Sequence, residues 1–327
     1  MRYRRLGAAG VQVSEVSLGS WLTYGGHVDD RAAEACVHRA YELGVNLFDT
    51  ADVYRRGDAE RVVGRALARY PRSSYVLATK VYFPVGDRPN DRGLSRKHIV
   101  ESCHASLERL GTDHIDLYQC HRFDADAPLD ETLRALDDLV SAGKVLYIGV
   151  SEWTAGQLDE ARAVGDRLLL DPIVSNQPQY SLLWRRIEED VIPVSERLGV
   201  GQIVWSPLAQ GVLSGKYRPG EPTPRDTRAG HPDPQTSQFV RLFMREDILE
   251  AVQRLRPIAD DLGLTMAQLA IAWVLRQPNV AGAIVGASRP EQLDDNCAAS
   301  GVELPPDALL RIDEAVSAVL PLQLPAG

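Results

Sequence analysis

The sequence predicts a (β/α)8 TIM barrel, in which eight parallel strands are surrounded by helices, and three observations support this fold. Short apolar segments alternate eight times with amphipathic helical segments, and the composition does not change along the chain. The apolar segments are continuous rather than alternating, which is typical of parallel strands buried on both faces. Most of them end in a polar residue, as strands that supply an active-site rim do.

Each strand is expected where roughly four to eight residues are rich in apolar side chains. A hairpin around Tyr3–Val13 is expected before the barrel begins. The eight barrel strands then follow as Val16–Gly19, Asn46–Thr50, Tyr75–Lys80, Ile115–Arg122, Val145–Ser151, Pro172–Gln177, Gln202–Pro207 and Gly282–Ser288.

Helical periodicity fills the intervals between these strands. A first helix is expected over Asp30–Leu43, and apolar residues three or four apart predict two others over Ile99–Leu110 and Leu129–Val140. Thr265 and Gln268 have the spacing of a capping box and open a further helix.

Two segments exceed the eight strand–helix units. Ala209–Arg245 holds five prolines and follows the seventh strand, so it is expected to form a long lid loop. Pro305–Leu320 is expected to be a terminal helix that ends in a loose tail, Leu320–Gly327. The whole chain, residues 1–327, is interpreted as one domain.

A doubly wound nucleotide-binding sheet would give the same alternation of strands and helices. That fold requires G-x-G-x-x-G after the first strand, and LGSWLTYGG does not supply it. The sequence contains no P-loop pattern either. The barrel is therefore favoured.

Charge and cysteine usage restrict the class of protein. The net charge of −9 and the pI of about 5.3 argue against nucleic acid or an anionic membrane as the main partner. The start of the chain lacks the apolar core of a signal peptide, and no apolar run approaches the ~18–20 residues of a membrane span. Four widely spaced cysteines fit reduced thiols, so a cytoplasmic location is expected.

Four polar residues on three consecutive strand ends form a candidate catalytic site. Asp49 ends the second strand and Tyr54 follows it, while Lys80 ends the third strand and His121 lies at the end of the fourth. An ammonium group beside a phenol is expected to lower the pKa of the tyrosine, and a carboxylate holds the lysine charged. Such a set suits proton donation to a carbonyl oxygen that gains negative charge as the carbon receives hydride.

Structural interpretations of these residues remain open when each is taken singly. Asp49 also fits a helix cap, Tyr54 a surface residue and His121 a core histidine. A metal site is disfavoured, because one histidine with Asp49 and Asp52 offers too few ligands and Lys80 opposes a cation. The acids that follow, Asp58 and Glu60, are expected in the first turn of the next helix.

A second candidate site lies at the end of the last strand. Gly286, Ser288 and Arg289 stand where a helix begins, and a helix N-terminus with small residues and an arginine makes an anion site. Ser288 and Glu291 also fit a capping box, so a structural role is equally open.

The neighbouring strand and the long loop offer further contacts to a nucleotide. Trp205 and Ser206 end the seventh strand, where the indole is expected either to stack on a planar ring or to be buried in the core. Lys216 and Arg228 in the long loop are candidates for a second phosphate group.

These residues resemble the aldo-keto reductase superfamily over essentially the whole chain. The segments FDTADVY, LATK and YQCHR match the family's catalytic motifs, and the resemblance implies a tetrad of Asp49, Tyr54, Lys80 and His121 with Tyr54 as the general acid. The segments GVSEW, SNQPQY, WSPLAQGVLSGKY and VGASRPEQLDDN resemble the branch that contains potassium-channel β subunits and bacterial enzymes of the glyceraldehyde-3-phosphate reductase type.

The resemblance also implies the nucleotide contacts. On the nicotinamide half and the diphosphate these are Ser151, Gln177, Trp205, Ser206, Leu208, Gly211 and Lys216. At the adenosine end they are Arg228, with Arg225 as its alternative, and Gly286, Ser288, Gln292, Asp295 and Asn296. Glu152 stands where the branch has arginine or serine. An arginine and a serine near a 2′-phosphate imply NADPH rather than NADH.

The function implied is an NADPH-dependent reductase of aldehydes or ketones, with Trp21, Tyr24 and Tyr82 lining the substrate mouth together with Phe83 and Trp153. The alternative is a nucleotide-sensing regulatory subunit, as channel β subunits are. A glycoside hydrolase with Asp49 and Glu152 as its carboxylates is a third hypothesis, which Lys80 beside Asp49 opposes. The branch further implies a homo-oligomer, either a tetramer or an octamer.

Overall fold

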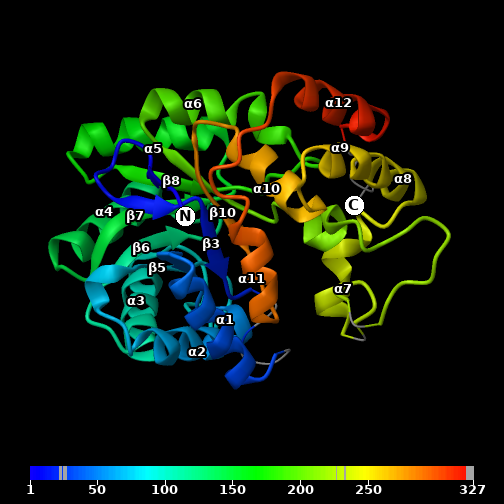
Figure 1. Ribbon diagram of the computed structural model, residues 1–327. Coiled ribbons are helices and arrows are strands. Elements are labelled where there is room, and N and C mark those ends of the chain that lie inside the picture. The colour runs from blue at the N-terminus through cyan, green and yellow to red at the C-terminus, as the bar shows by residue number, and fades with distance from the viewer. Residues whose placement is uncertain (22–23, 25–27, 226, 232, 322–327) are drawn as a thin grey trace.

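The computed structural model describes residues 1–327 except 22, 23, 25–27, 226, 232 and 322–327. In this part of the chain, eight parallel strands close into a barrel in the order β10-β3-β4-β5-β6-β7-β8-β9 (Figure 1). These strands are β3 Val16–Gly19, β4 Leu47–Asp49, β5 Val76–Val81, β6 Ile115–Cys120, β7 Val145–Ser151, β8 Ile173–Gln177, β9 Gly201–Trp205 and β10 Val280–Val285. The predicted (β/α)8 barrel is confirmed.

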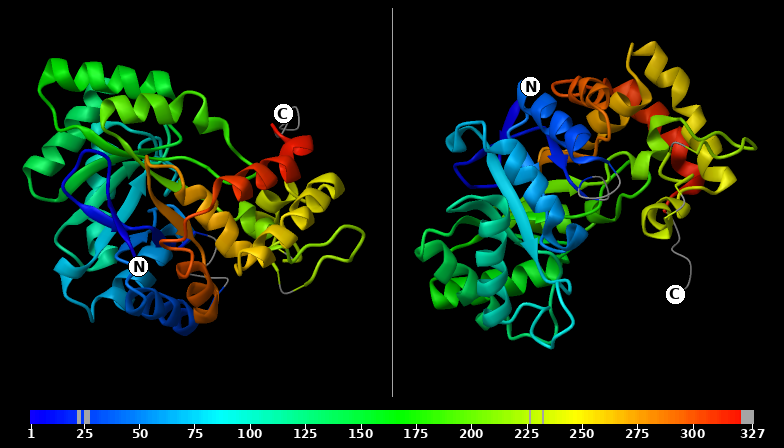
Figure 2. Two further views of the ribbon diagram at one scale, coloured as in Figure 1. Left: turned by 45° about the horizontal axis from the view of Figure 1, so that its top comes forward. Right: turned by 90° about the horizontal axis from the view of Figure 1, so that it is seen from below.

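The predicted N-terminal hairpin is also present, as β1 Tyr3–Arg5 and β2 Gln12–Ser14. Leu6 and Val13 pack with the apolar residues inside the barrel. The Ala8 N–H donates to the Gly199 carbonyl at 2.8 Å, just before β9 begins. The hairpin (blue in Figure 2) therefore closes the N-terminal end of the barrel and leaves the C-terminal end for a site.

Helices surround the strands and bury apolar faces against them. They are α1 Asp30–Glu42, α2 Asp58–Leu67, α3 Arg96–Leu110, α4 Leu129–Ser141, α5 Ala155–Leu168, α6 Val191–Leu198, α10 Met266–Leu275 and α11 Pro290–Cys297. The capping box predicted at Thr265 and Gln268 is present at the start of α10: the backbone N–H of each residue donates to the side-chain oxygen of the other. Every residue of α10 except Gln268 is buried.

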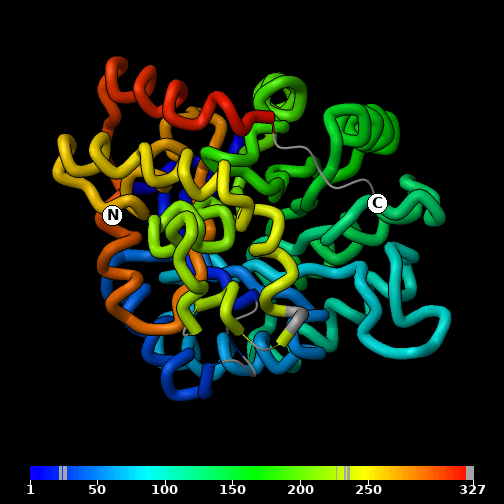
Figure 3. Tube along the Cα trace, turned by 90° about the vertical axis from the view of Figure 1, so that its right-hand side faces the viewer, coloured from blue at the N-terminus to red at the C-terminus, as the bar shows by residue number. Residues whose placement is uncertain are grey.

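The excursion after β9 is present, but it is not a plain loop. It contains a 3-10 helix at Ala209–Ser214 and α7 at Pro234–Arg241, and it is followed by α8 Glu246–Arg254 and α9 Arg256–Asp261. Val240 and Phe243 are buried in the main core, so tertiary burial orders a segment whose prolines predict a loop. Figure 3 shows this excursion, green to yellow, on the side of the molecule that carries α8 and α12.

The predicted terminal helix is found as α12 Pro306–Val316, continued by a 3-10 turn at Ser317–Val319. Arg254 of α8 donates from Nε to the Ala315 carbonyl at 3.1 Å and so ties α12 to α8. The predicted tail Leu320–Gly327 lies, from residue 322 onward, outside the described residues.

Four strands end earlier than the sequence predicts, including β4 at Asp49 and β9 at Trp205. β10 covers Val280–Val285 rather than Gly282–Ser288, because the Ser288 N–H turns to the Gln292 side chain at 2.8 Å and not to a neighbouring strand. β6 ends at Cys120, so that His121 and Arg122 leave the sheet and face the rim.

Among the described helices, no single one is long and apolar enough to cross a membrane. The stretch Glu246–Asp261 reaches that length and hydropathy only when it is joined to α10, to which it is bent by 89°.

Candidate active site

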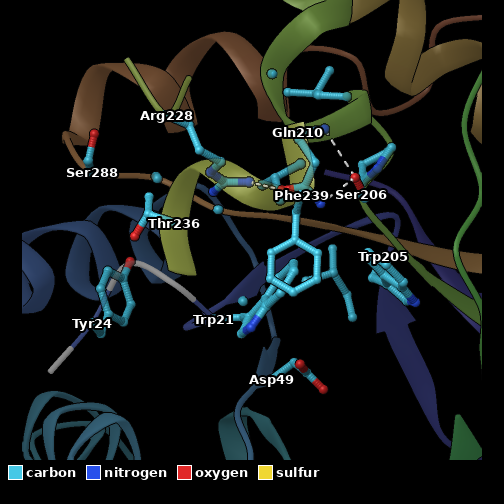
Figure 4. A pocket seen from close by; sticks show the side chains of 18 of the residues that line it. Trp21, Tyr24, Asp49, Trp205, Ser206, Gln210, Arg228, Thr236, Phe239 and Ser288 are labelled. Carbon is cyan, nitrogen blue, oxygen red and sulfur yellow. Dashed lines mark hydrogen bonds between the residues drawn. The ribbon is translucent and has the colours of Figure 1, made fainter. Parts of the chain in front are cut away.

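A cavity of about 980 Å³ opens at the C-terminal ends of the barrel strands. Its wall includes the last residues of β4, β7, β8, β9 and β10 and parts of the excursion. Figure 4 shows Asp49 on one side of this cavity and Ser288 and Arg228 on another, with the rings of Trp21 and Phe239 between them. The site therefore extends from the predicted tetrad to the predicted adenosine end.

Lys80 and Asp49 form a buried ion pair at the cavity floor. Lys80 Nζ donates to Asp49 Oδ2 at 2.6 Å and to the Thr50 carbonyl at 2.8 Å. Asp49 Oδ1 accepts from Gln177 Nε2 at 2.9 Å and from Gln119 Nε2 at 3.3 Å. Both charges thus have several partners, as burial demands.

The tyrosine and the histidine stand above this pair. Lys80 Nζ lies 3.4 Å from the Tyr54 hydroxyl, and the Tyr54 and His121 rings meet edge to face with centroids 5.7 Å apart. Tyr54, His121 and Asp49 line the cavity, whereas Lys80 lies behind them and does not line it. The structure brings all four predicted residues together.

A turn of unusual backbone geometry carries Tyr54. Arg55 and Arg56 have φ values of 51° and 54°, and Gly57 follows at 91°. A positive φ of this size favours glycine, and a Cβ on Gly57 would lie 2.4 Å from Arg109 Cδ and displace that side chain. Arg109 is itself held by Glu60 at 2.5 Å, which fixes the base of the turn.

Glu60 corrects the sequence-based interpretation of the α2 first turn. It was expected to be an ordinary first-turn acid, but its side chain is completely buried. It bonds Arg109 and accepts from Thr79 Oγ1 at 2.6 Å. The tertiary contacts with α3 and β5 explain this burial, which sequence position alone does not indicate.

The pKa of Tyr54 also differs from the sequence-based expectation. Burial raises the pKa of Tyr54 well above its ordinary value, and the nearby Asp49 charge raises it further, although Arg122 opposes this. The phenol is therefore protonated at neutral pH. Burial lowers the pKa of His121 well below its ordinary value, and the charges of Lys80 and Arg122 add to this effect, so the imidazole is neutral.

Asp52 lies close in sequence but belongs to a different environment. Its carboxylate is buried and accepts from Ser102 Oγ of α3 at 2.7 Å. Burial raises the pKa of Asp52 to about 7, and the charge of Glu60 adds to this effect.

We expect Asp52 to make stability depend on pH. Between its ordinary pKa of 3.8 and about 7, folded Asp52 holds a proton that the unfolded chain releases, so raising the pH over this window favours unfolding. The free energy of unfolding is expected to fall by up to about 1.4 kcal/mol per pH unit in this window. We would measure the free energy of unfolding by urea at pH 5, 6, 7 and 8. It should fall less steeply with pH for Asp52→Asn than for the unchanged chain. Glu160→Gln, an exposed control, should keep the original slope; equal slopes for all three would contradict the expectation.

All thirteen predicted nucleotide contacts line the cavity. They are Ser151, Gln177, Trp205, Ser206, Leu208, Gly211, Lys216, Arg228, Gly286, Ser288, Gln292, Asp295 and Asn296. Arg225, the alternative to Arg228, lines it too, but is exposed whereas Arg228 is half-buried. Placement in one cavity leaves their roles as predictions.

The excursion contributes a residue that the sequence did not single out. Gln210 donates from Nε2 to Ser206 Oγ at 2.9 Å, and its carbonyl oxygen accepts from the Arg228 guanidinium (Figure 4). This link fastens Arg228 over the cavity. No periodicity or motif marks Gln210, because its position depends on a turn with a φ of 59°.

Ser288 is bonded differently from the predicted capping box. The Gln292 side chain, not Glu291, accepts from the Ser288 N–H at 2.8 Å and from its hydroxyl at 3.3 Å. Ser288 is nevertheless exposed and lines the cavity.

Trp205 and Glu152 are joined in the part of the cavity predicted to hold the nucleotide. Trp205 Nε1 donates to Glu152 Oε1 at 2.7 Å, and the same oxygen accepts from the Gln179 N–H at 2.6 Å. Glu152 thereby fixes the indole in the cavity wall. Since the carboxylates of Glu152 and Asp49 are both held by donors, the structure gives no support to a pair of glycosidase carboxylates.

The predicted mouth aromatics divide into two groups. Trp21 and Tyr24 line the cavity, and Trp21 packs edge-on against Phe239 of α7 at 4.9 Å between centroids. Tyr82 does not line it; its ring packs edge-on against Phe83, which does. Trp153 is buried in the core against Phe123.

The described residues contain no group of three or more histidine, cysteine or acidic side chains placed to hold a metal ion.

The comparisons with known proteins agree with this arrangement. The sequence pattern of the aldo/keto reductase family matches residues 15–317. The chain is 42% identical to a probable voltage-gated potassium channel subunit beta from Arabidopsis thaliana, over 97% of both chains. It is 41% identical to a probable voltage-gated potassium channel subunit beta from Oryza sativa subsp. japonica, over 97% of both chains. It is 40% identical to a putative voltage-gated potassium channel subunit beta from Schizosaccharomyces pombe, over 96% of this chain and 93% of that protein. The chain belongs to the aldo/keto reductase family.

Proposed function

We propose that this protein is an NADPH-dependent oxidoreductase that reduces aldehyde or ketone carbonyls to alcohols. The observation that carries the proposal is the meeting of the Tyr54 hydroxyl, the neutral His121 ring and the Lys80–Asp49 pair at one end of a 980 Å³ cavity. Membership of the aldo/keto reductase family supports an oxidoreductase role.

The residues of the cavity fit a dinucleotide. Lys216 Nζ lies 3.1 Å from the place where a Cβ on Gly211 would stand, and Gly211 has a φ of 93°, so glycine leaves room for a ligand beside this cation. Arg228 and Ser288 at the far side suit a 2′-phosphate, which favours NADPH over NADH. A bound nicotinamide supplies a hydride to the carbonyl carbon.

Tyr54 is the proposed general acid. Its raised pKa keeps the proton in place until the carbonyl oxygen becomes negative. Lys80 Nζ, 3.4 Å away, then stabilises the phenolate as it forms, and Asp49 holds the ammonium in position.

His121 is proposed to orient the substrate. Its buried Nδ1 has no partner among the described residues, so the proton belongs on Nε2, where it is available to the carbonyl oxygen. Burial and two neighbouring cations keep the ring neutral, so it donates a hydrogen bond without competing as an acid.

Two measurements on the unchanged protein test the proposal. Fluorescence titration should show NADPH binding about tenfold or more tightly than NADH, since one charge-assisted contact is worth that ratio. Loss of NADPH absorbance should follow addition of aldehydes, ketones and sugar aldehydes over many turnovers. Absence of nucleotide binding would refute the proposal.

A second candidate is an NADP(H)-sensing regulatory subunit. The three relatives at 40–42% identity are named as channel β subunits, and this observation favours it. It predicts tight nucleotide binding with little steady-state turnover and co-purification with a membrane channel. Rapid turnover without such a partner favours the enzyme.

We expect Glu152 to influence nucleotide affinity through Trp205. Glu152→Ala removes the acceptor of both Trp205 Nε1 and the Gln179 N–H, so the indole loses its fixed position. Loss of about 1–2 kcal/mol corresponds to an NADPH Kd raised about 5- to 30-fold. Fluorescence titration measures this, and Glu152→Gln, which keeps an acceptor oxygen, should lose less. An unchanged Kd for the alanine variant would contradict the expected role.

A further inference from the structure

The reacting end of the cavity carries a guanidinium that the proposed chemistry does not use. Arg122 follows His121 directly, lines the cavity and is half-buried. One of its N–H groups donates to the His121 carbonyl at 2.5 Å, and its Cζ lies 5.4 Å from the centre of the Phe83 ring. Phe83 in turn meets the His121 ring at 4.8 Å between centroids. Arg122 is therefore held beside the catalytic histidine.

The charge of Arg122 has no carboxylate partner in the described residues. Two other arginines near the site do: Arg109 pairs with Glu60 at 2.5 Å, and Arg55 faces Asp233 of the excursion at 3.9 Å. An anionic ligand can therefore serve as the counter-ion of this guanidinium. A guanidinium has five donors, and here one serves the protein.

The field of Arg122 reaches the reacting groups. Its charge lowers the pKa of His121, of Lys80 and of Tyr54 relative to what burial alone would give. An anionic group close to Arg122 would therefore lie close to the carbonyl that Tyr54 and His121 address. The surrounding wall is aromatic, with Trp21, Phe83 and Phe239, so a substrate with an apolar body and one charged end fits it.

We propose that Arg122 selects carbonyl substrates that carry an oxyanion, a carboxylate or a phosphate group, near the aldehyde or ketone. This inference rests on the proposed carbonyl reduction and names its substrate class. The planar donors of the guanidinium match the two oxygens of a carboxylate or of a phosphate, and the aromatic wall lowers the competition from water. Because the net charge of the chain is −9, a local cation at the site offsets the overall repulsion of an anionic substrate.

Matched substrate pairs test the proposal in the full-length protein. We would compare kcat/KM for 4-carboxybenzaldehyde with 4-methylbenzaldehyde, and for succinic semialdehyde with butanal, in the unchanged protein and in Arg122→Gln. The intrinsic reactivity of each aldehyde cancels when the anion-to-neutral ratio is compared between the two proteins. We expect Arg122→Gln to lower this ratio about 10- to 100-fold, chiefly through KM, and Arg122→Lys to lower it less. Glyceraldehyde 3-phosphate against glyceraldehyde distinguishes a phosphate preference from a carboxylate one.

A charge-matched control is available on the surface. Arg186 is exposed, packs over the Trp184 ring at 4.5 Å and does not line the cavity. Arg186→Gln removes the same charge and should leave the ratio unchanged. An equal fall for both members of each pair in Arg122→Gln, which leaves the anion-to-neutral ratio as it is in the unchanged protein, would overturn the proposal while carbonyl reduction stands.

Binding without turnover separates the two proposals. 4-(Hydroxymethyl)benzoate should quench the fluorescence of cavity tryptophans more strongly than 4-methylbenzyl alcohol, and Arg122→Gln should remove the difference. If the anion binds through Arg122 but no carbonyl is reduced, the reductase proposal fails and the anion site stands. If neither compound binds preferentially, the anion site fails.

Discussion

Tyr54→Phe should lower kcat for carbonyl reduction about 10²- to 10⁴-fold, the usual loss when a positioned general acid is removed. The substitution deletes the hydroxyl that lies 3.4 Å from Lys80 Nζ and keeps the ring that packs against His121. Nucleotide affinity should change little, because the predicted nucleotide contacts lie elsewhere in the cavity. Steady-state rates and a fluorescence titration with NADPH measure the two quantities separately.

The matched control is Tyr70→Phe. The Tyr70 hydroxyl lies 3.2 Å from His38 Nδ1, its ring stacks on Tyr41, and Tyr70 does not line the cavity. It should keep the rate of the unchanged protein. A Tyr54→Phe variant that reduces aldehydes at a near-normal rate would eliminate Tyr54 as the proton donor, although nucleotide binding would remain to be explained.

Lys80→Met should destabilise the fold by about 3–5 kcal/mol, the cost of leaving one partner of a buried ion pair alone. Lys80 and Asp49 are buried and bonded at 2.6 Å, and methionine replaces the lysine with an apolar chain of similar length. The Asp49 carboxylate keeps the amide donors of Gln177 and Gln119 but loses its counter-charge. Urea unfolding at pH 7 measures the loss.

The double variant Lys80→Met with Asp49→Asn is the decisive comparison. If the cost comes from an unpaired buried charge, removing that charge should restore part of the lost stability. Costs that simply add would show instead that shape, not charge, determines the effect. Neither variant should support turnover, since Tyr54 would lack the ammonium that stabilises its phenolate.

The sequence was sufficient to predict the barrel and the meeting of the four predicted tetrad residues at one rim. Apolar runs mark the strands, and in a parallel barrel their carboxyl ends all reach one rim, so Asp49, Lys80 and His121 had to converge. The nucleotide contacts were assigned by resemblance, and each of them lines the same cavity. The convergence of these residues depends on the order and direction of the strands, and the local pattern of apolar and polar residues is enough to predict both.

Properties that depend on burial and on contacts distant in sequence could not be predicted in this way. Burial reversed the expected shift in the pKa of Tyr54, and contact with Arg109 buried Glu60. Tyr82 lies outside the cavity whereas Phe83 lines it, because successive residues after a strand point in different directions.

The excursion shows the same division between sequence and structure. Its prolines identified a long segment over the barrel, but only packing shows that Gln210 holds Arg228 and that Phe239 meets Trp21. The sequence by itself determined the barrel, the rim and the residues that reach it. Tertiary structure alone decided their protonation, their counter-ions and the cation at Arg122, because these depend on which distant groups exclude water from each charge.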